Sequence, residues 1–238
     1  MSDLLTIAIE AHGGMDRWRR IDRIRIAGSI TGAIWFVKSR GDVLKNVEFT
    51  VDTKRQLLTM DFPGEDKRTV FEGEQVTVLN SKGEVTVKND HAERSFDGHK
   101  PDTPWDDIHV AYFSGEALWT YLNTPFLYAR EGFKAEEISS ITVDRETWRR
   151  LQITFPSSIK THTRTQISCF GPDGLLRRHD YTVDILGGAQ GLNYAYDYRN
   201  VGGIMVPTSR RVAAYEGDFK PVWEPVLVEI EMHEVSLL

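Results

Sequence analysis

Apolar and polar residues alternate along most of the chain, and this pattern predicts a series of short β-strands. Turn signals such as Pro63-Gly64 and Ser81-Lys82-Gly83 separate the runs at the spacing of antiparallel hairpins. The expected strands cover residues 24–37, 43–49, 53–61, 67–72, 75–80, 84–88, 142–155, 161–170, 175–185, 193–200, 204–215 and 226–235. Two short helices, separated by His12-Gly13-Gly14, are expected ahead of them. We therefore predict a mainly β protein built as an antiparallel meander.

A helical pattern interrupts the strands near the middle of the chain. Thr103 precedes Pro104, and Asp106 follows three residues after Thr103, which is typical of a capped helix start. The helix is expected to end at residues 123–125 (Asn-Thr-Pro). Its apolar and aromatic residues recur at helical spacing: Trp105, Ile108, His109, Tyr112, Leu118, Trp119 and Leu122. We expect this helix to plug a curved sheet, and a second role, in which its ring edges line a ligand site, is compatible with the first.

A Gly-Pro-Asp-Gly turn signal at residues 171–174 predicts a hairpin between the strands on either side. If the two glycines face each other, Gln166 lies opposite His179 and Arg164 lies opposite Tyr181. The residues that alternate with these are short, hydroxyl-rich or charged, which is typical of a solvated face. We therefore expect the face that carries the four named side chains to point inward.

A second hairpin is expected around residues 201–204 (Val-Gly-Gly-Ile), where two glycines favour the primed turns of hairpins. This turn places Asp197 across from Thr208 and Ala195 across from Arg210. The second hairpin thus adds further polar side chains to the predicted inward face.

The glycine-rich loop at residues 187–191 leaves the register between the two hairpins less defined. Pairing Leu186 with Leu192 would bring Asp197 beside Tyr181. A slip of one residue would turn the opposite side chains inward, because neighbouring residues of a strand face opposite sides. The predicted inward cluster comprises His162, Arg164, Gln166, His179, Tyr181, Asp197, Thr208 and Arg210.

The length of 238 residues is sufficient for a substantial core, and we expect one domain spanning residues 1–238. Acidic residues outnumber basic residues by 35 to 29, which gives a net charge of −6. This balance provides no basic stripe, so no nucleic-acid partner is expected. The single cysteine, Cys169, excludes an intramolecular disulfide and is interpreted as a small buried apolar residue. The sequence leaves the oligomeric state open.

The N-terminal segment, residues 1–10, contains no positively charged stretch followed by a long apolar run, so it does not resemble a secretory signal. No other window reaches the roughly 18 apolar residues that would span a bilayer. We therefore expect a cytoplasmic protein without a transmembrane segment.

Three stretches of the chain carry a family resemblance. They are Ala11-His-Gly-Gly-Met-Asp-Arg-Trp18 leading into residues 24–28, Phe170-Gly-Pro-Asp-Gly-Leu-Leu176, and Tyr198-Arg-Asn-Val-Gly-Gly-Ile-Met-Val-Pro-Thr208. Together they resemble the LolA/LolB-like superfamily of periplasmic lipoprotein carriers and mycobacterial lipoprotein relatives. The resemblance implies an incomplete, half-open antiparallel β-barrel wrapped around a central plug helix, with an apolar cavity that holds acyl chains. This chain differs from the family in lacking a visible export signal and in having a polar predicted inner face.

The predicted inner face suggests acid/base chemistry. His179 and Tyr181, near Asp197, are the candidate catalytic groups, because histidine titrates near neutrality and a tyrosine can be activated by a cationic neighbour. The alternative is that these polar groups only satisfy one another in the interior. Either Arg164 or Arg210 is suited to bind a carboxylate or enolate oxygen. The expected ligand-binding residues are His162, Arg164, Gln166, Arg210, His109, Tyr112 and Trp119.

No metal site and no cofactor are expected, because the histidines lack a His-x-x-x-His spacing and no glycine-rich loop leads from a strand into a helix. We predict a protein that encloses an apolar or amphipathic small molecule and acts on it by cofactor-independent acid/base chemistry, as an isomerase, lyase or cyclase would. The alternative is a carrier or sensor that only binds a lipid-like ligand. The inner face discriminates between the two, since ionisable groups converging on the ligand favour catalysis and an aliphatic lining favours carriage.

Overall fold

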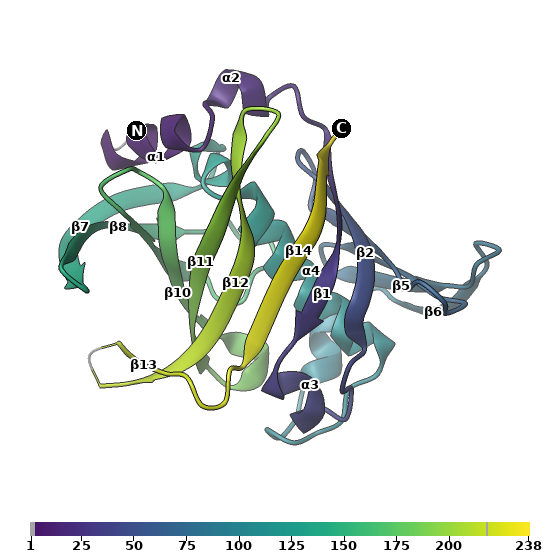
Figure 1. Ribbon diagram of the computed structural model, residues 1–238. Coiled ribbons are helices and arrows are strands. Elements are labelled where there is room, and N and C mark those ends of the chain that lie inside the picture. Colours follow the sequence, from purple (N-terminus) through teal and green to yellow (C-terminus); the bar gives the residue numbers. More distant parts are fainter. Residues whose placement is uncertain (1–2, 218) are drawn as a thin grey trace.

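One curved antiparallel sheet makes up most of the computed structural model, which describes residues 3–217 and 219–238 (Figure 1). Its strands are β1 (Arg23–Thr31), β2 (Leu44–Asp52), β3 (Leu57–Asp61), β4 (Arg68–Glu72), β5 (Gln75–Leu79), β6 (Val85–Asn89), β7 (Lys134–Val143), β8 (Glu146–Thr154), β9 (Thr165–Phe170), β10 (Leu176–Val183), β11 (Ala189–Val201), β12 (Ile204–Glu216), β13 (Lys220–Val222) and β14 (Val228–Leu237). The order is β6-β5-β4-β3-β2-β1-β14-β12-β11-β10-β9-β8-β7, and β13 pairs with β12 beside this path. The sheet is open, with β6 and β7 at its two edges, so the predicted half-open antiparallel barrel is confirmed.

Short helices lie at both ends of the sheet. The helices are α1 (Asp3–Ala11), α2 (Met15–Trp18), α3 (Ala33–Val37) and α4 (Asp107–Asn123), with the 3-10 helices η1 (Ala92–Phe96), η2 (Phe126–Ala129) and η3 (Asp184–Leu186). In Figure 1, α1 and α2 lie at the upper end and α3 at the lower end. The strand predicted for residues 24–37 is wrong beyond Thr31, where the chain turns into α3. Gly32 has a φ of 123°, and a Cβ there would collide with the carbonyl oxygen of Leu227, so this turn requires glycine.

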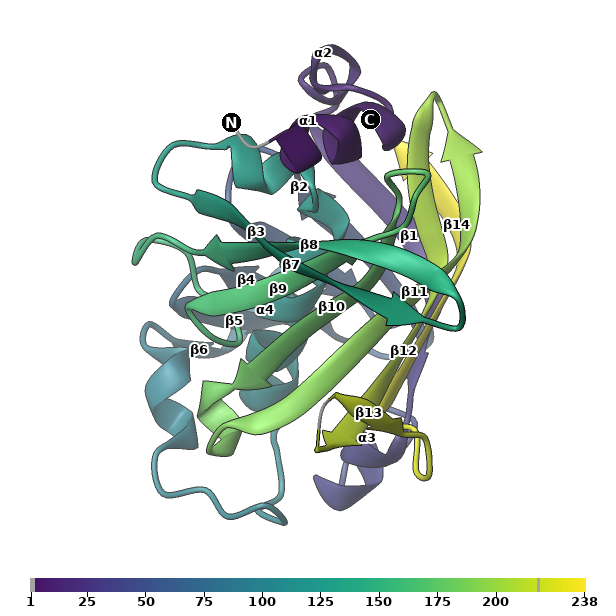
Figure 2. The same cartoon turned by 90° about the vertical axis from the view of Figure 1, so that its left-hand side faces the viewer.

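The helix α4 lies in the hollow of the sheet and packs against the half that contains β2 to β6 (Figure 2). All of its residues from Ile108 to Asn123 are buried. The Trp119 indole donates from Nε1 to the carbonyl oxygens of Asp52 at 3.0 Å and Arg55 at 2.7 Å. These contacts confirm that α4 is the plug helix expected from the sequence.

The start of α4 differs from the prediction, because its N-cap is Asp106 rather than Thr103. The Asp106 carboxylate accepts a hydrogen bond from His109 N at 3.1 Å, and Asp106 N donates to His109 Nδ1 at 3.1 Å. This reciprocal pair satisfies N–H groups that a helix start leaves without an internal partner. The ring of His109 therefore serves the helix cap.

The first predicted hairpin, between β9 and β10, forms with a different register. His179 pairs with Ser168, and an irregularity between Leu176 and Arg178 accounts for the shift from the predicted pairing. Because the shift is an even number of residues, His179 and Tyr181 keep the predicted inward orientation. Both side chains are buried.

The second hairpin has the predicted register, since Ala195 pairs with Arg210. The predicted pairing across the glycine-rich loop is wrong: His179 lies beside Asn193, because η3 occupies chain that was expected to continue the strand. Asn193 is fully buried, and Gly191 takes the place beside Tyr181 that the sequence assigns to Asp197.

Candidate functional site

A cavity of about 560 Å³ opens at the end of the molecule where α3 lies, at the bottom of Figure 1. Residues of α3, the chain around residues 99–101, the turn between β10 and β11, and the chain that leads into β14 surround it. Most of its lining side chains are aliphatic or aromatic, among them Phe113, Val183, Ile185, Leu186, Leu227 and Val228. Both the volume and the lining are typical of a small-molecule site.

A smaller cavity of about 30 Å³ lies next to the first one and is lined in part by α4. The side chains common to both cavities are Phe113, His162, Tyr181, Val212 and Val228. Of the predicted site residues, His162 and Tyr181 therefore lie at the cavity wall. Their inward orientation is confirmed, and their role in ligand binding stays a prediction.

His162 forms a buried pair with Glu116 of α4. The His162 Nδ1 atom lies 2.6 Å from Glu116 Oε1, and both side chains are almost fully buried. Burial raises the pKa of the Glu116 carboxyl, and the neighbouring His162 opposes that rise. Our sequence interpretation missed Glu116, although a carboxylate in the middle of a mostly apolar helix is a signal for a buried partner.

Tyr181 contacts a second tyrosine from the plug helix. The Tyr121 hydroxyl donates to the Tyr181 hydroxyl at 2.6 Å, and both rings are buried. Burial raises the pKa of Tyr121 to about 12 and raises the pKa of Tyr181 well above its usual range. Both phenols consequently stay protonated near neutral pH and act as hydrogen-bond donors or acceptors rather than as bases.

His179 lies in the interior but does not line the cavity. Its Nε2 atom donates to Gln166 Oε1, and its Nδ1 atom lies 3.3 Å from the Tyr128 hydroxyl and 3.4 Å from Ser168 Oγ. Burial lowers the pKa of His179 to about 3, so the imidazole is neutral near neutral pH. Gln166 and His179 are thus both inward, as predicted, but they satisfy each other within the core.

Arg210 is fully buried without a carboxylate partner among the described residues. Its Nη1 atom lies 3.4 Å from Asn193 Oδ1, and Nη2 lies 3.3 Å from the Tyr121 carbonyl oxygen. The Nε atom has no hydrogen-bond partner within the described chain. Burial lowers the pKa of Arg210. The residue does not line the large cavity, so its predicted inward position is confirmed without a contact to the ligand site.

Two residues of the predicted inward cluster are on the outside. Arg164 is exposed and precedes β9, so it does not take part in the hairpin pairing. Asp197 is exposed and has a φ of 53°, a left-handed conformation that interrupts the alternation of β11. Thr208 donates from Oγ1 to the Asp197 carbonyl oxygen at 2.7 Å. The pairs on either side, Tyr196 with Ser209 and Tyr198 with Pro207, keep the predicted register while the Asp197 side chain is exposed. The predicted interior roles of Arg164 and Asp197 are therefore wrong.

The three predicted ligand contacts on α4 lie away from the cavity lining. His109 Nε2 is 3.2 Å from the Ser95 carbonyl oxygen. The Tyr112 ring packs edge-on against Phe71. Together with Trp119, these residues hold the plug helix in the sheet, and no contact in the structure supports a ligand role for them.

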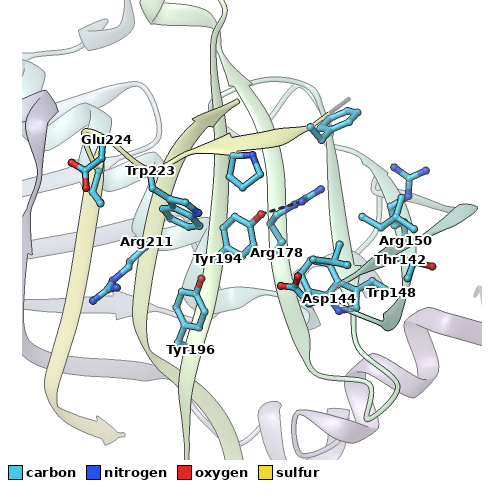
Figure 3. Close-up of a pocket in the computed structure, with 15 residues that line it drawn as sticks. Thr142, Asp144, Trp148, Arg150, Arg178, Tyr194, Tyr196, Arg211, Trp223 and Glu224 are labelled. Carbon is cyan, nitrogen blue, oxygen red and sulfur yellow. Dashed lines mark hydrogen bonds between the residues drawn. The ribbon is translucent and has the colours of Figure 1, made fainter. Parts of the chain in front are cut away.

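A larger hollow of about 1080 Å³ lies on the outer face of the sheet, between the β7–β8 hairpin and residues 219–226 (Figure 3). Arg178 is buried there and donates from Nε and Nη2 to the Asp180 carboxylate at 2.6 and 2.8 Å. Its guanidinium carbon lies 5.7 Å from the Trp148 ring centre and 5.5 Å from the Tyr194 ring centre. A carboxylate and two aromatic rings thus already hold this cation.

The outer face at this hairpin differs from the solvated face that the sequence predicts. A second cluster of buried apolar residues covers it, formed by Trp148, Cys169, Leu192 and Tyr194. Arg178 and Asp180 are buried beside this cluster. The covering comes from β7, β8 and the chain after β12, which are distant in sequence from the hairpin. Burial raises the pKa of the Cys169 thiol, as befits an apolar packing residue.

Within residues 3–217 and 219–238, no three or more histidine, cysteine, aspartate or glutamate side chains are grouped to hold a metal ion. Among the helices of this same part of the chain, none has the length and apolar character needed to cross a membrane.

Several solved structures resemble this chain. A DUF1329 family protein from Desulfovibrio piger has a TM-score of 0.56 and 12% identity, over 98% of this chain and 91% of that chain. A LolA superfamily protein from Nitrosomonas europaea has a TM-score of 0.54 and 10% identity, over 97% of this chain and 92% of that chain. No family model and no curated protein sequence matches the chain. At these identities the likeness concerns the fold, and the chain has the LolA-like fold that its sequence resemblance implies.

Proposed function

We propose that the protein binds a lipid-like, apolar or amphipathic molecule in the cavity beside α3 and holds it as a carrier or sensor. The observation that carries this proposal is the apolar lining of a cavity of about 560 Å³ within a LolA-like half-barrel. Apolar ligand surface buried there gains about 25 cal/mol per Å² removed from water. The resemblance to the LolA/LolB-like superfamily supports the same ligand class, because it implies a cavity for acyl chains.

The predicted catalytic residues do not meet at this cavity. His179 is neutral and does not line it, and Asp197 is on the outside. Tyr181 does line it, but burial raises the pKa of this phenol, so it is not a base near neutral pH. A group that abstracts a proton must reach the ligand, so the geometry supports binding better than acid/base turnover.

A binding measurement with the neutral fluorescent probe N-phenyl-1-naphthylamine tests the proposal. We expect saturable binding with a Kd on the order of micromolar and a negative heat-capacity change, which is the mark of apolar burial. In Leu227→Trp, the larger side chain enters the cavity from its half-buried position and should weaken probe binding by about tenfold or more.

A matched control is Leu237→Trp, because Leu237 is also half-buried and lies at the far end of β14, away from the cavity. This variant should bind the probe like the unmodified protein. Equal affinities in all three proteins would place the probe elsewhere and contradict the proposal. Native mass spectrometry of the purified protein would show whether a small molecule is retained.

A further inference from the structure

We infer that the ligand of this cavity is an acidic amphiphile, with its anionic head against Lys38, His99 and Lys100 and its apolar tail along η3. We call these three residues the basic corner. The inference rests on the proposed function, since it names the ligand class for the same cavity. The lysine charges of the lining and the unpartnered Nδ1 atom of His99 support it independently.

The charged side chains that line the cavity are two lysines, Lys38 and Lys100, and no aspartate or glutamate among the described residues belongs to the lining. Burial lowers the pKa of His99, so its imidazole contributes a hydrogen-bonding group rather than a charge. The chain as a whole has the opposite balance, with 35 acidic and 29 basic residues. A cavity with local positive charge in an acidic protein attracts an anionic group and orients it.

Lys38 is the buried member of the basic corner, with only 2% of its surface exposed. Its Nζ atom donates to the carbonyl oxygens of Pro101 at 2.7 Å and Lys100 at 3.5 Å. Among the described residues, no carboxylate is in ion-pair contact with it, and Asp102, whose charge acts on it, is exposed. An ammonium has three donors, and burying it without an anion is costly. A carboxylate or phosphate of the ligand would offset that cost.

Two buried polar atoms have no hydrogen-bond partner among the described residues: Nδ1 of His99, in the basic corner, and Nε1 of Trp105. The Trp105 ring centre is 5.2 Å from Lys38 Nζ, and Trp105 N donates to the Lys38 carbonyl oxygen at 2.9 Å. Buried polar atoms nearly always have partners. Trp105 does not line the cavity, whereas His99 does. The unpartnered Nδ1 atom of His99 therefore marks a position in the cavity wall that fits an oxygen acceptor.

Most of the remaining lining is apolar and suits an alkyl chain. Ile185 and Leu186 of η3 and Leu227 before β14 are examples. One charged corner and a long apolar wall match one anionic head and one tail, a chemistry shared by fatty carboxylates and alkyl phosphates. Arg210 is also a cation without a carboxylate, but it does not line the cavity and is not part of this site.

Displacement of N-phenyl-1-naphthylamine by four amphiphiles of one chain length tests the inference: decanoate, decyl phosphate, decanol and decyltrimethylammonium. We expect the two acids to displace the probe at concentrations about tenfold lower than decanol, because a charge-assisted hydrogen bond exceeds a neutral one. The cationic amphiphile should be the weakest. The order of the two acids then distinguishes a carboxylate head from a phosphate head.

Lys38→Met should remove most of the preference for acids over decanol and leave the decanol affinity within about twofold, because the head contact and the tail contact are separate. Lys38→Arg should retain the preference, since it keeps the charge. Lys100→Met changes an exposed side chain, so it tests the corner without a risk to folding, and it should lower the preference in part. Lys45→Met is the matched control, because Lys45 is exposed and outside the cavity.

Equal affinity for acids and decanol in the unmodified protein would overturn the inference and leave the proposed function intact. A probe that does not bind, or that no amphiphile displaces, would overturn the proposed function itself. If Lys38→Met weakened decanol and decanoate equally and Lys100→Met left the preference unchanged, Lys38 would only hold the chain at residues 100–101, and the inference would be wrong.

Discussion

His162 Nδ1 lies 2.6 Å from Glu116 Oε1, and this buried pair joins the plug helix α4 to the chain that leads into β9. Removal of one member leaves the other buried without its partner, which costs about 3 to 5 kcal/mol for a charged pair. We therefore expect Glu116→Leu to lower the free energy of unfolding by about that amount, as measured by urea denaturation. His162→Leu should be similarly destabilising, and the double variant should lose much less than the sum.

An exposed ion pair provides the control for this comparison of single and double variants. Arg211 Nε lies 2.8 Å from Glu229 Oε1, with 52% and 33% of the two side chains exposed. Glu229→Leu should change the free energy of unfolding by less than about 1 kcal/mol. Additive effects of the two buried substitutions would show that Glu116 and His162 are not coupled in the core.

The second prediction concerns the pH dependence of stability. Burial lowers the pKa of His179 from 6.5 to about 3, so between these values the unfolded chain binds a proton that the folded protein excludes. Stability is therefore lost as the pH falls through this window, at ~1.4 kcal/mol per pH unit from this residue. His179→Gln should reduce the slope of unfolding free energy against pH by about this amount, as measured by denaturant titrations across the acid range.

His12 sharpens this test. Burial lowers the pKa of His12 to about 4. The pH range over which His12 makes stability depend on pH is therefore narrower than that of His179. His12→Gln should reduce the slope only above about pH 4, whereas His179→Gln should act further into the acid range. Slopes identical to that of the unmodified protein in both variants would mean that the histidines are protonated in the folded state.

Much of the fold could be predicted because its signals are local. The glycine pair at residues 202–203 determines the β11–β12 register, and Ala195 lies opposite Arg210 as expected. The β10–β11 register could not be predicted, since η3 and the glycines after it leave the length of the turn undefined by the local pattern. The expectations of a single domain and a cytoplasmic location stay predictions.

The site could be predicted only in part, because several of its features depend on distant contacts. Alternation places Tyr181 at the cavity wall, but a left-handed residue at Asp197 reverses the pattern with no signal in its neighbours. The position of Lys38 at the cavity could not be predicted, because the apolar residues before it resemble a strand. The contact between Gly32 and Leu227, far apart in the chain, directs that segment into α3 and brings Lys38 to the cavity.

A third prediction tests the plug helix. Trp119 is fully buried and donates to two carbonyl oxygens, one from the last residue of β2 and one from the chain after it. Trp119→Ala should lower the free energy of unfolding by about 3 to 5 kcal/mol, because it removes a large core side chain and leaves a void. Trp223→Ala, at the half-buried wall of the outer hollow, should cost much less. An unchanged melting temperature for Trp119→Ala would mean that α4 does not support the sheet.

The fourth prediction uses the buried ion pair of the outer hollow. Arg178 donates two hydrogen bonds to Asp180, and both side chains are buried. Arg178→Met leaves the Asp180 carboxylate buried without its cation, so it should cost about 3 to 5 kcal/mol of stability. Urea unfolding near neutral pH measures this loss. A loss below 1 kcal/mol would show that Asp180 gains access to water or a proton in the variant.

The last prediction applies the same substitution to the other buried arginine and expects the opposite result. Arg210 has no carboxylate partner among the described residues, its Nε atom lacks a hydrogen bond there, and its two contacts to oxygen are long, at 3.3 and 3.4 Å. Arg210→Met removes the desolvation cost of this cation and keeps most of its apolar contacts, so stability should change by less than about 1 kcal/mol or increase. The comparison with Arg178→Met, under identical urea unfolding, applies the same substitution to a buried arginine that has a carboxylate partner and to one that has none among the described residues. A loss for Arg210→Met as large as that for Arg178→Met would show that Asn193 and the Tyr121 carbonyl oxygen compensate the Arg210 charge as effectively as a carboxylate does.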